Sequence, residues 1–457
     1  MKPSSTPAPA RRLASALSIP TISHADRTRE PHPEAFPRFE QFLADSFPLV
    51  FSGSSCESPG APGLLFRLPG RSETLAPIIL AAHYDVVPAG AADDWRLPPF
   101  SGQIHDDCIW GRGALDDKAS LLAIMEAVES LLAEGFQPER DLYLAFGGDE
   151  EVTGTRGAAR IAALLQQRGI QAAAVIDEGT AVVHDTIGMV RRPVALIGTA
   201  EKGYLDVQLS CRASDGHASM PQRRTAAGRL ARALRRLERR PFPARLRPVV
   251  AGFLRQLAPA APALLRPLLR FPRLFWPLLR PVLAANPKTD AMIRTTQAPT
   301  MLSGSAAPNV LPAEVSAVIN LRLLPGDSIA GVLRRLQRVV RDPAISITPL
   351  LPEGSSEPVP ESPVDGWVYR GLQDSVTAAF PDAVIAPYLV TATTDSKHYR
   401  AVADAIYRFL PLPMGPAELA MIHGVDERIA ITDYLRMIGF YRDLIQRLTG
   451  NSPGEEA

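Results

Sequence analysis

Three short apolar runs separated by two helical stretches limit the fold of this 457-residue chain more than any other feature. The runs cover residues 76–82, 142–146 and 172–176, and their continuous apolar character is typical of strands buried on both faces. Between them, residues 118–134 and 157–168 carry apolar side chains at helical spacing. This order of strand, helix, strand, helix and strand predicts a largely parallel sheet covered by helices, in the α/β class.

A second kind of pattern begins near Gly198. Residues 204–210 and 313–323 alternate apolar and polar side chains, which is typical of half-buried antiparallel strands. Helical stretches at 226–239 and 328–340 accompany them. These segments predict a smaller α+β domain inserted into the first one, whose own pattern then resumes.

The predicted fold class is therefore α/β, with a three-layer main domain around a mostly parallel central sheet and an inserted smaller α+β domain. Residues 1–198 and 356–457 would form the main domain in two parts, and residues 199–355 the inserted domain. A Pro- and Arg-rich apolar insertion at about 240–290 falls within the inserted domain.

Composition excludes several classes of function. The 49 Lys and Arg residues nearly balance 48 Asp and Glu residues, so no overall field draws the protein to nucleic acid. Cys56, Cys108 and Cys211 form no CxxC pair, which excludes a disulfide framework and a cysteine zinc finger. No run reaches the roughly 18 to 20 apolar residues that a membrane span requires.

The first residues do not have the pattern of a secretion signal. Two arginines precede a short apolar stretch that Ser15 and Ser18 interrupt, and no small-residue cleavage site follows. We therefore expect a disordered leader, then an amphipathic helix, and a cytoplasmic location.

The segment 239–289 contains many arginines and apolar residues but no acidic residue. One interpretation is a proline-broken helical elaboration that packs on its own domain. The alternative is a basic, apolar surface for an acyl chain or for contact with lipid at a membrane interface.

His83 and Asp85 directly follow the first apolar run. The spacing HxD is weak evidence by itself, because residues 24–26 and 105–107 share it, but only His83 follows a predicted buried strand. A metal-bound imidazole usually donates its other N–H to a carboxylate or a similar acceptor, which fixes its tautomer. Asp85 is chemically suited to that role.

Asp116 and Asp117 lie in a glycine-rich turn just before the predicted helix 118–134. Adjacent acids at a helix start can simply be caps. A carboxylate between two cations can instead bridge them with its two oxygens. The sequence leaves both interpretations open.

Acidic pairs follow the other two apolar runs, Glu150 and Glu151 after the second and Asp177 and Glu178 after the third. The carboxyl ends of parallel strands are where sites lie in such sheets. A solvated turn is the alternative for these acids. With a metal present, one glutamate can be a ligand and its neighbour a general base.

His423 lies in a glycine turn before the last predicted helix, and alone it would be only a surface histidine. Together the clusters supply two imidazoles and several carboxylates. Such nitrogen and oxygen ligands suit zinc, and two ions close together form a hydrolytic site.

Seven motifs in order along the chain resemble the co-catalytic zinc metallopeptidases: HYDVVP, GRGALDDK, GGDEE, DEG, GHAS, APNVLP and IHGVDE. That family includes carboxypeptidase S, aminoacylase, carnosinase, glutamate carboxypeptidase, acetylornithine deacetylase and succinyl-diaminopimelate desuccinylase. The stretches EEVTGTRGA, EKG, AMIRTT and TDSKHYR are most similar to the branch of carboxypeptidase S and N-fatty-acyl amino acid synthase/hydrolase.

The resemblance implies a catalytic main domain that binds two Zn²⁺ ions, for which Co²⁺ or Mn²⁺ can substitute. Asp116 would bridge the ions, and Asp85 would orient the metal ligand His83. Glu150 would act as general base on the water that bridges the zinc ions. The implied metal ligands are His83, Asp116, Glu151, Asp177 and His423, with Glu178 as the alternative to Asp177.

The resemblance further implies that the inserted domain is a lid and a surface for homodimer formation. His217 would help to polarise the scissile carbonyl, from the partner subunit in dimeric members. Asn309 and Arg322 fall at the spacing of the substrate-binding asparagine and arginine. A turn residue and a solvated strand position are the plain alternatives for these two.

The expected function is zinc-dependent hydrolysis of the amide bond in N-acyl amino acids or in peptides with a free C-terminal carboxylate. An N-fatty-acyl amino acid is the preferred substrate, because the insertion at about 240–290 could house the chain. A dipeptidase, a short-acyl aminoacylase and a catalytically silent metal-binding dimer are the alternatives. No nucleic-acid partner is expected.

Overall fold

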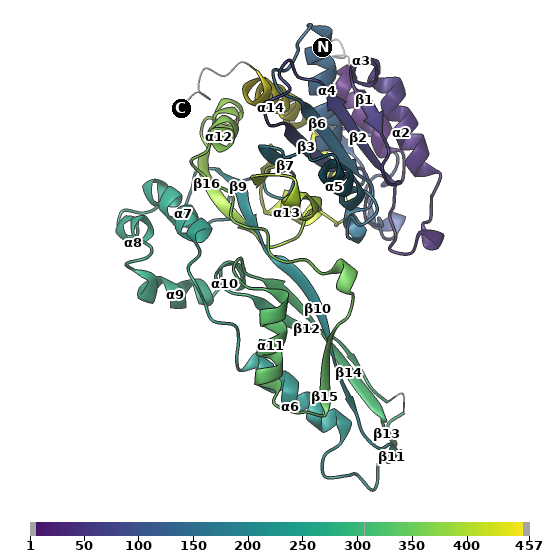
Figure 1. Ribbon diagram of the computed structural model, residues 1–457, viewed down its shortest axis with the longest axis vertical. Coiled ribbons are helices and arrows are strands. Elements are labelled where there is room, and N and C mark those ends of the chain that lie inside the picture. The colour runs from purple at the N-terminus through teal and green to yellow at the C-terminus, as the bar shows by residue number, and fades with distance from the viewer. Residues whose placement is uncertain (1–5, 306, 451–457) are drawn as a thin grey trace.

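The computed structural model describes residues 6–305 and 307–450, which form two lobes joined by long strands (Figure 1). The larger lobe is built on a ten-stranded sheet, and the smaller, elongated lobe on a four-stranded sheet. The predicted α/β class with an inserted smaller α+β domain is therefore confirmed. The predicted domain boundaries stay a prediction.

The ten-stranded sheet is parallel at its centre, in the order β6-β3-β7-β17. β3 (Ile78–His83) runs parallel to β6 (Leu142–Gly147) and to β7 (Ala174–Asp177), and β17 (Ile406–Arg408) runs parallel to β7. Every residue of β3, β6 and β7 is buried, as expected of strands covered on both faces. The three apolar runs thus form three adjacent central strands. The flanking strands are β1 (Ser55–Glu57), β2 (Gly63–Leu68), β8 (Val182–Val183), β9 (Val194–Glu201), β16 (Val384–Val390) and β18 (Pro413–Met414).

Helices cover both faces of this sheet and make the larger lobe a three-layer unit. On one face α4 (Lys118–Ala133), α12 (Trp367–Ala379) and α14 (Ile431–Thr449) share an apolar cluster with strand residues such as Leu80. On the other face α5 (Ala158–Gln167) packs against the intervening strand residues. The two helices predicted between the central strands are α4 and α5.

The smaller lobe has two layers. Its sheet has the order β12-β14-β10-β15, and β10 buries every second residue against two helices, as the sequence alternation predicts. A short pair, β11 with β13, lies at the end of this lobe farthest from the ten-stranded sheet (Figure 1). The elements are β10 (Gly203–Arg212), β11 (Gly216–His217), α6 (Ala226–Glu238), β12 (Thr296–Ser303), β13 (Val310–Leu311), β14 (Glu314–Leu323), α11 (Ile329–Val340) and β15 (Ile345–Pro349).

The proline-rich insertion forms four short helices, as its composition predicts. They are α7 (Pro248–Leu257), α8 (Arg266–Arg270), α9 (Trp276–Ala284) and α10 (Pro287–Ile293). We expected this elaboration to pack on the inserted domain, but α7 packs against β9 and β16 of the large sheet. The ring of Phe253 meets that of Tyr388 edge-on, with centroids 5.7 Å apart. The difference arises because the apolar face of the smaller sheet is already covered by α6 and α11. β16 has an apolar face of its own, and α7 covers that one.

The amphipathic helix predicted near the start of the chain is α1 (Ala8–Leu17), whose apolar side packs into the main core. The leader predicted before it includes residues 1–5, which lie outside the described residues. Within residues 6–305 and 307–450, no helix is long and apolar enough to cross a membrane.

Candidate active site

The carboxyl ends of three central strands bring the predicted side chains together. His83 is the last residue of β3, Glu150 and Glu151 follow β6 in a short 3-10 turn, and Asp177 ends β7. Because β3 runs parallel to its neighbours β6 and β7, these three segments end at one edge of the sheet.

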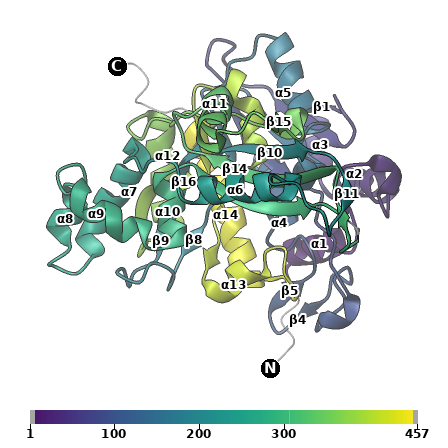
Figure 2. The same ribbon diagram turned by 90° about the horizontal axis from the view of Figure 1, so that it is seen from below.

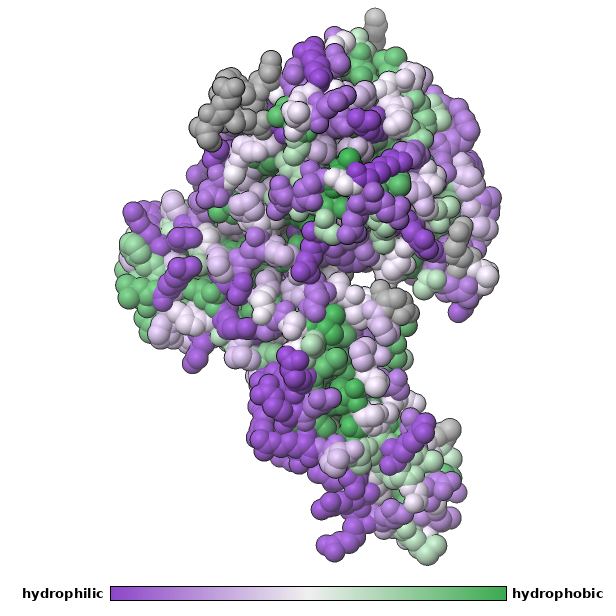
Figure 3. Space-filling model, in the orientation of Figure 1, coloured by the Kyte–Doolittle hydropathy of each residue, from purple (hydrophilic) through white to green (hydrophobic). Residues whose placement is uncertain are grey.

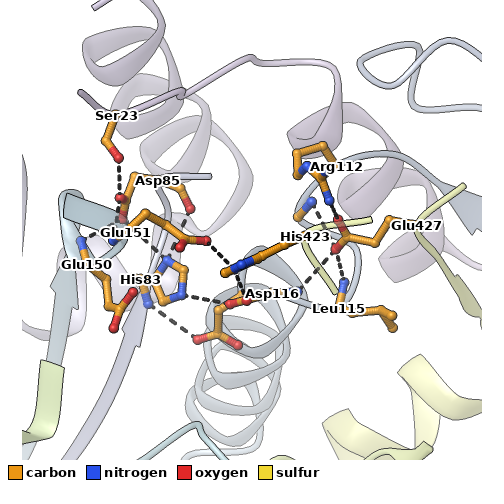
Figure 4. Close-up of polar contacts among 12 residues, drawn as sticks. Ser23, His83, Asp85, Arg112, Leu115, Asp116, Glu150, Glu151, His423 and Glu427 are labelled. Atoms are coloured by element: carbon orange, nitrogen blue, oxygen red, sulfur yellow. Dashed lines mark hydrogen bonds and ion pairs between the residues drawn. The ribbon is translucent and has the colours of Figure 1, made fainter. Parts of the chain in front are cut away.

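Asp116 lies between the two histidines (Figure 4). Its Oδ1 is 3.0 Å from Nε2 of His83, and its Oδ2 is 3.1 Å from Nε2 of His423. Nε2 of His423 is also 3.2 Å from Oε1 of Glu151. His423 comes from the loop between α13 (Pro416–Met421) and the final helix, some 270 residues beyond Glu151 in sequence, so only folding brings the two together.

Asp85 is fully buried and contacts the segments that carry His83 and the two glutamates. Its carbonyl oxygen lies 3.1 Å from Nδ1 of His83, and its Oδ1 lies 3.3 Å from the same nitrogen. The backbone N–H groups of Glu150 and Glu151 donate to its two carboxylate oxygens at 3.1 Å, and the hydroxyl of Ser23 donates at 2.7 Å. Asp85 therefore fixes both the imidazole of His83 and the turn that carries the two glutamates.

Glu427 holds the turn that carries Asp116, a role that the sequence did not reveal. Its buried carboxylate accepts N–H bonds from Gly113, Leu115 and Asp116, at 3.1, 2.7 and 3.2 Å. Arg112 donates to its other oxygen at 2.7 Å (Figure 4). The signal in the sequence was the acid that follows His423 by four residues in IHGVDE.

A small sheet brings Glu427 to this turn. β5 (Cys108–Trp110) precedes the turn, and β19 (Arg428–Ala430), which follows Glu427, pairs with it. β4 (Ile104–His105) completes the sheet on the other side of β5. Pairing of β5 with β19 therefore sets the positions of Asp116 and His423 relative to each other.

Burial of so many acids perturbs their pKa values. Desolvation raises the pKa of Glu150 and of Glu178 well above the ordinary value, and it also raises the pKa of Glu151. Burial acts in the same direction on Asp116, but hydrogen bonds to His423 and His83 hold the pKa of Asp116 below its ordinary value. The neighbouring carboxylates, first Asp116 and then Glu151, raise the pKa of His423 to about 10. The cluster therefore stabilises positive charge at its centre.

The donor set fits metal ions. One ligand atom each from His83, Asp116 and Glu151 lies within 4.8 Å of the others, and His423 lies next to two of them. Oε1 of Glu151 is buried and accepts no well-formed hydrogen bond among the described residues. Imidazole and carboxylate ligands of this kind suit zinc.

The fourth acidic ligand has two candidates. Asp177 is buried, and the N–H of Ser396 donates to its Oδ2 at 2.8 Å. No hydrogen bond to its Oδ1 occurs among the described residues. Glu178 is partly exposed and lines the cavity beside Asp116.

A cavity of about 950 Å³ opens from the cluster. Asp116, Glu150, Glu151, Glu178 and His423 line its polar end. The remaining wall is largely apolar and comes from the large sheet and from the insertion, with Leu196, Phe253, Leu254, Leu257, Leu283, Met292, Tyr388, Leu410 and Met414 among its residues. The insertion at about 240–290, which was expected to accommodate an acyl chain, thus forms one wall of the cavity.

Of the three predicted substrate-binding residues, only Arg322 lines this cavity. Its guanidinium carbon lies 4.5 Å from the centre of the Tyr204 ring, and its Nε donates to Asn320 at 3.4 Å. His217 and Asn309 are exposed and belong to the β11–β13 end of the smaller lobe, far from the cavity within one chain (Figure 1).

Sequence reasoning also missed Lys397, which lines the cavity from the stretch TDSKHYR. Its ammonium is one of the charges that lower the pKa of Glu150, against the larger effect of burial. The motif marks the family resemblance, but nothing in its spacing indicates which side chain faces the cavity.

A family model matches most of the chain, and curated relatives match nearly all of it. The model of peptidase family M20/M25/M40 matches residues 79–447. "Probable carboxypeptidase S-like 2" of Dictyostelium discoideum is 38% identical over 442 residues, covering 96% of this chain and 84% of that protein. "N-fatty-acyl-amino acid synthase/hydrolase PM20D1" of Mus musculus is 36% identical over 440 residues, covering 95% of this chain and 86% of that protein.

Solved structures share the fold. The M20 family metallo-carboxypeptidase Sso-CP2 from Sulfolobus solfataricus aligns with a TM-score of 0.70 at 19% identity, over 96% of this chain and 99% of that one. Human carnosine dipeptidase 1 aligns with a TM-score of 0.64 at 15% identity, over 97% and 96%. The predicted family is thus confirmed, and the chain belongs to peptidase family M20/M25/M40, as an enzyme that hydrolyses amide bonds.

Proposed function

We propose that this protein is a zinc-dependent hydrolase of N-acyl amino acids whose acyl group is long and apolar. The observation that carries the proposal is the single cavity of about 950 Å³ that joins the acidic cluster to an apolar wall. A volume of this size is at the upper end of the range for small-molecule sites. A dipeptide would leave most of the apolar wall empty.

The proposed ligands of two zinc ions are His83, Asp116 and Asp177 for one and Asp116, Glu151 and His423 for the other. Asp177 is preferred over Glu178 because an amide donor orients its carboxylate, as is usual for ligating carboxylates. Bound zinc would polarise the substrate carbonyl and lower the pKa of water. Asp177→Asn should then lose one ion per chain by elemental analysis, while Glu178→Gln keeps two; the reverse result would exchange their roles.

Glu150 is the proposed general base. Its carboxylate accepts a proton from the attacking water and returns it to the amine nitrogen as the C–N bond breaks, which yields a carboxylate and a free amine. Glu150→Gln should retain metal and fold but lose roughly 10²–10⁴-fold in kcat. Near-normal turnover by this variant would remove Glu150 from the mechanism.

The substrate would be held at both ends. Arg322 is suited to pair with its carboxylate, because a planar guanidinium can donate to both oxygens. The acyl chain would lie along Phe253, Leu254 and Leu257 of α7, where each buried methylene contributes about 0.8 kcal/mol.

Comparing acetyl-phenylalanine with oleoyl-phenylalanine tests this orientation. We expect the oleoyl substrate to have the higher kcat/KM, and Phe253→Asp to abolish that preference while leaving acetyl-phenylalanine little changed. Leu419→Asp, at a cavity-lining residue of α13 outside the insertion, is the matched control. Faster hydrolysis of the acetyl substrate or of dipeptides by the unmodified enzyme would favour a short-acyl aminoacylase or dipeptidase instead. Two bound ions without any hydrolysis would favour the silent metal-binding dimer.

We also propose a homodimer formed through the smaller lobe, in which His217 acts in the partner's cavity. β12 is the edge strand of its sheet, and Met301 and Leu302 on it are 63% and 71% exposed, which leaves this edge free to pair. Mixing inactive Glu150→Gln with inactive His217→Ala should restore activity to part of the population, because heterodimers then contain one complete site. Mixtures that remain inactive although subunits exchange would show that His217 does not act across subunits.

A further inference from the structure

The insertion carries an apolar patch on its outer side, away from the cavity. Helices α8 and α9 and the chain around them project at one edge of the molecule in both views (Figures 1 and 2). Figure 3 shows hydrophobic and hydrophilic side chains gathered over this projection. We define the α8–α9 patch by its exposed apolar residues, Leu264, Phe271, Leu274, Leu278 and Val282, which are 54–89% exposed, and by Arg266, Arg270, Arg273 and Arg280.

The charge of this patch has one sign. Nine arginines and one lysine occur between residues 239 and 289, and no acid does. Some of these arginines are neutralised within the fold, since Arg245 pairs with Asp327 and Arg247 with Glu361. The four arginines of the patch, by contrast, are exposed and form no ion pair with any described residue. The exposed apolar side chains are therefore surrounded by free positive charge.

The same insertion forms part of the cavity wall. Phe253 and Leu257 of α7 and Leu283 at the end of α9 line the cavity, while Leu278 and Val282 of α9 face outward. Trp276, the partly buried first residue of α9, is of a residue type that favours the boundary between apolar and polar media. The helix α9 therefore contributes residues both to the exposed patch and to the cavity wall.

We propose that the α8–α9 patch docks on the surface of anionic phospholipid, with its apolar side chains among the acyl chains and its arginines at the headgroups. Two copies of this chain meeting at the patch would bring eight unpaired arginines together, which like-charge repulsion disfavours. A lipid surface offers apolar depth and negative charge within the same few ångströms. Docking requires no catalysis, so it stands or falls separately from the proposed substrate.

Co-sedimentation with vesicles tests the proposal. One set of vesicles contains phosphatidylcholine alone, and the other contains phosphatidylcholine with 30% phosphatidylglycerol, which gives a roughly physiological surface charge. We expect binding to the anionic vesicles that weakens as salt is added, because screening reduces the attraction. Arg270→Glu with Arg273→Glu should weaken partitioning by about 25-fold or more, at about fivefold for each cation removed. Leu274→Ser with Leu278→Ser should weaken binding to anionic vesicles as well, since both anchors are apolar.

The matched control is Arg334→Glu with Arg338→Glu, which changes the net charge equally at two exposed arginines of α11 on the smaller lobe. These residues belong to the other lobe, so the control should bind within roughly threefold of the unmodified protein. Equal loss in the control and patch variants would show only a net-charge effect and overturn the proposal. Absence of binding to anionic vesicles would also overturn it. The same holds if the patch variants change the oligomeric mass of the protein in solution but not its binding to vesicles. Circular dichroism verifies that each variant is folded.

Discussion

Replacing Glu427 by glutamine should weaken the contacts that hold the turn carrying Asp116, while changing the size of the side chain very little. Glu427 and Arg112 are both buried, and the pair is 2.7 Å apart. Arg112 also donates to the carbonyl oxygen of Gly424 at 2.8 Å, but its Nε has no partner among the described residues. Glu427→Gln therefore leaves a buried guanidinium without a counter-charge.

The expected cost follows from this burial. Removing one partner of a buried ion pair destabilises a protein by about 3–5 kcal/mol. Glutamine keeps one carbonyl oxygen for the N–H groups of Leu115 and its neighbours, so we expect the lower end, about 3 kcal/mol. Because Asp116 shifts with the turn, zinc affinity should also fall by roughly 10–100-fold, the usual effect of losing a residue that orients a ligand.

Urea unfolding followed by circular dichroism measures the first effect, and competition with a chelator the second. Glu57→Gln is the control, because Glu57 forms a similar two-point pair with Arg168 in which both side chains are about 40% exposed, and its loss should cost below about 1 kcal/mol. Adding Arg112→Met to Glu427→Gln should cost less than the sum of the two single changes. A loss at Glu427 no larger than that at Glu57 would refute this account of the turn.

Three further outcomes are expected. The pKa of His423 is raised to about 10 in the metal-free protein, so a metal ion that binds this imidazole, as proposed, must displace a proton from it at pH 7. The affinity for zinc should therefore fall as pH falls, and calorimetry of zinc binding in two buffers should find more protons released than for His423→Asn. Burial, followed by the charge of Lys397, lowers the pKa of His398 to about 4 from its ordinary 6.5. The unfolded chain then binds the proton first, so the folding stability present above pH 6.5 should be lost as pH falls towards 4. His398→Gln should lessen that loss, as measured by acid unfolding. Asp85→Asn should lower kcat more than it raises KM, since it loosens both His83 and the Glu150 turn; a change in KM alone would contradict that role.

The fold was predictable where one physical signal dominates. Short continuous apolar runs are typical of central strands in a covered sheet, and β3, β6 and β7 begin and end within two residues of the predicted limits. Helix limits were equally close for α4, whose residues 118–128 are all buried, and for α6, where apolar spacing sets one buried face. The packing of α7 was not predictable, because an apolar helix face does not indicate which of two sheets will cover it.

The site was predictable in its chemistry and only partly in its members. His83, Asp116, Glu151 and His423 lie together because strand ends and a glycine turn carry them. Glu427 was visible only as an acid in the IHGVDE motif, and its role was not, because partners that are mostly backbone N–H groups leave no mark on residue type elsewhere in the sequence. Glu178, Lys397 and the apolar wall depend on which side of a loop faces the cavity, and one-dimensional spacing does not determine this.

Sequence by itself determined the layers of this protein and the kinds of atoms at its reactive edge, because burial periodicity and ligand chemistry are properties of local residue type. Tertiary structure alone decided that His423 meets Glu151, that Glu427 supports Asp116, and that a basic apolar insertion turns one side to the cavity and the other outward. Those outcomes depend on contacts between residues tens to hundreds of positions apart, which are set by the packing of whole elements rather than by any local preference.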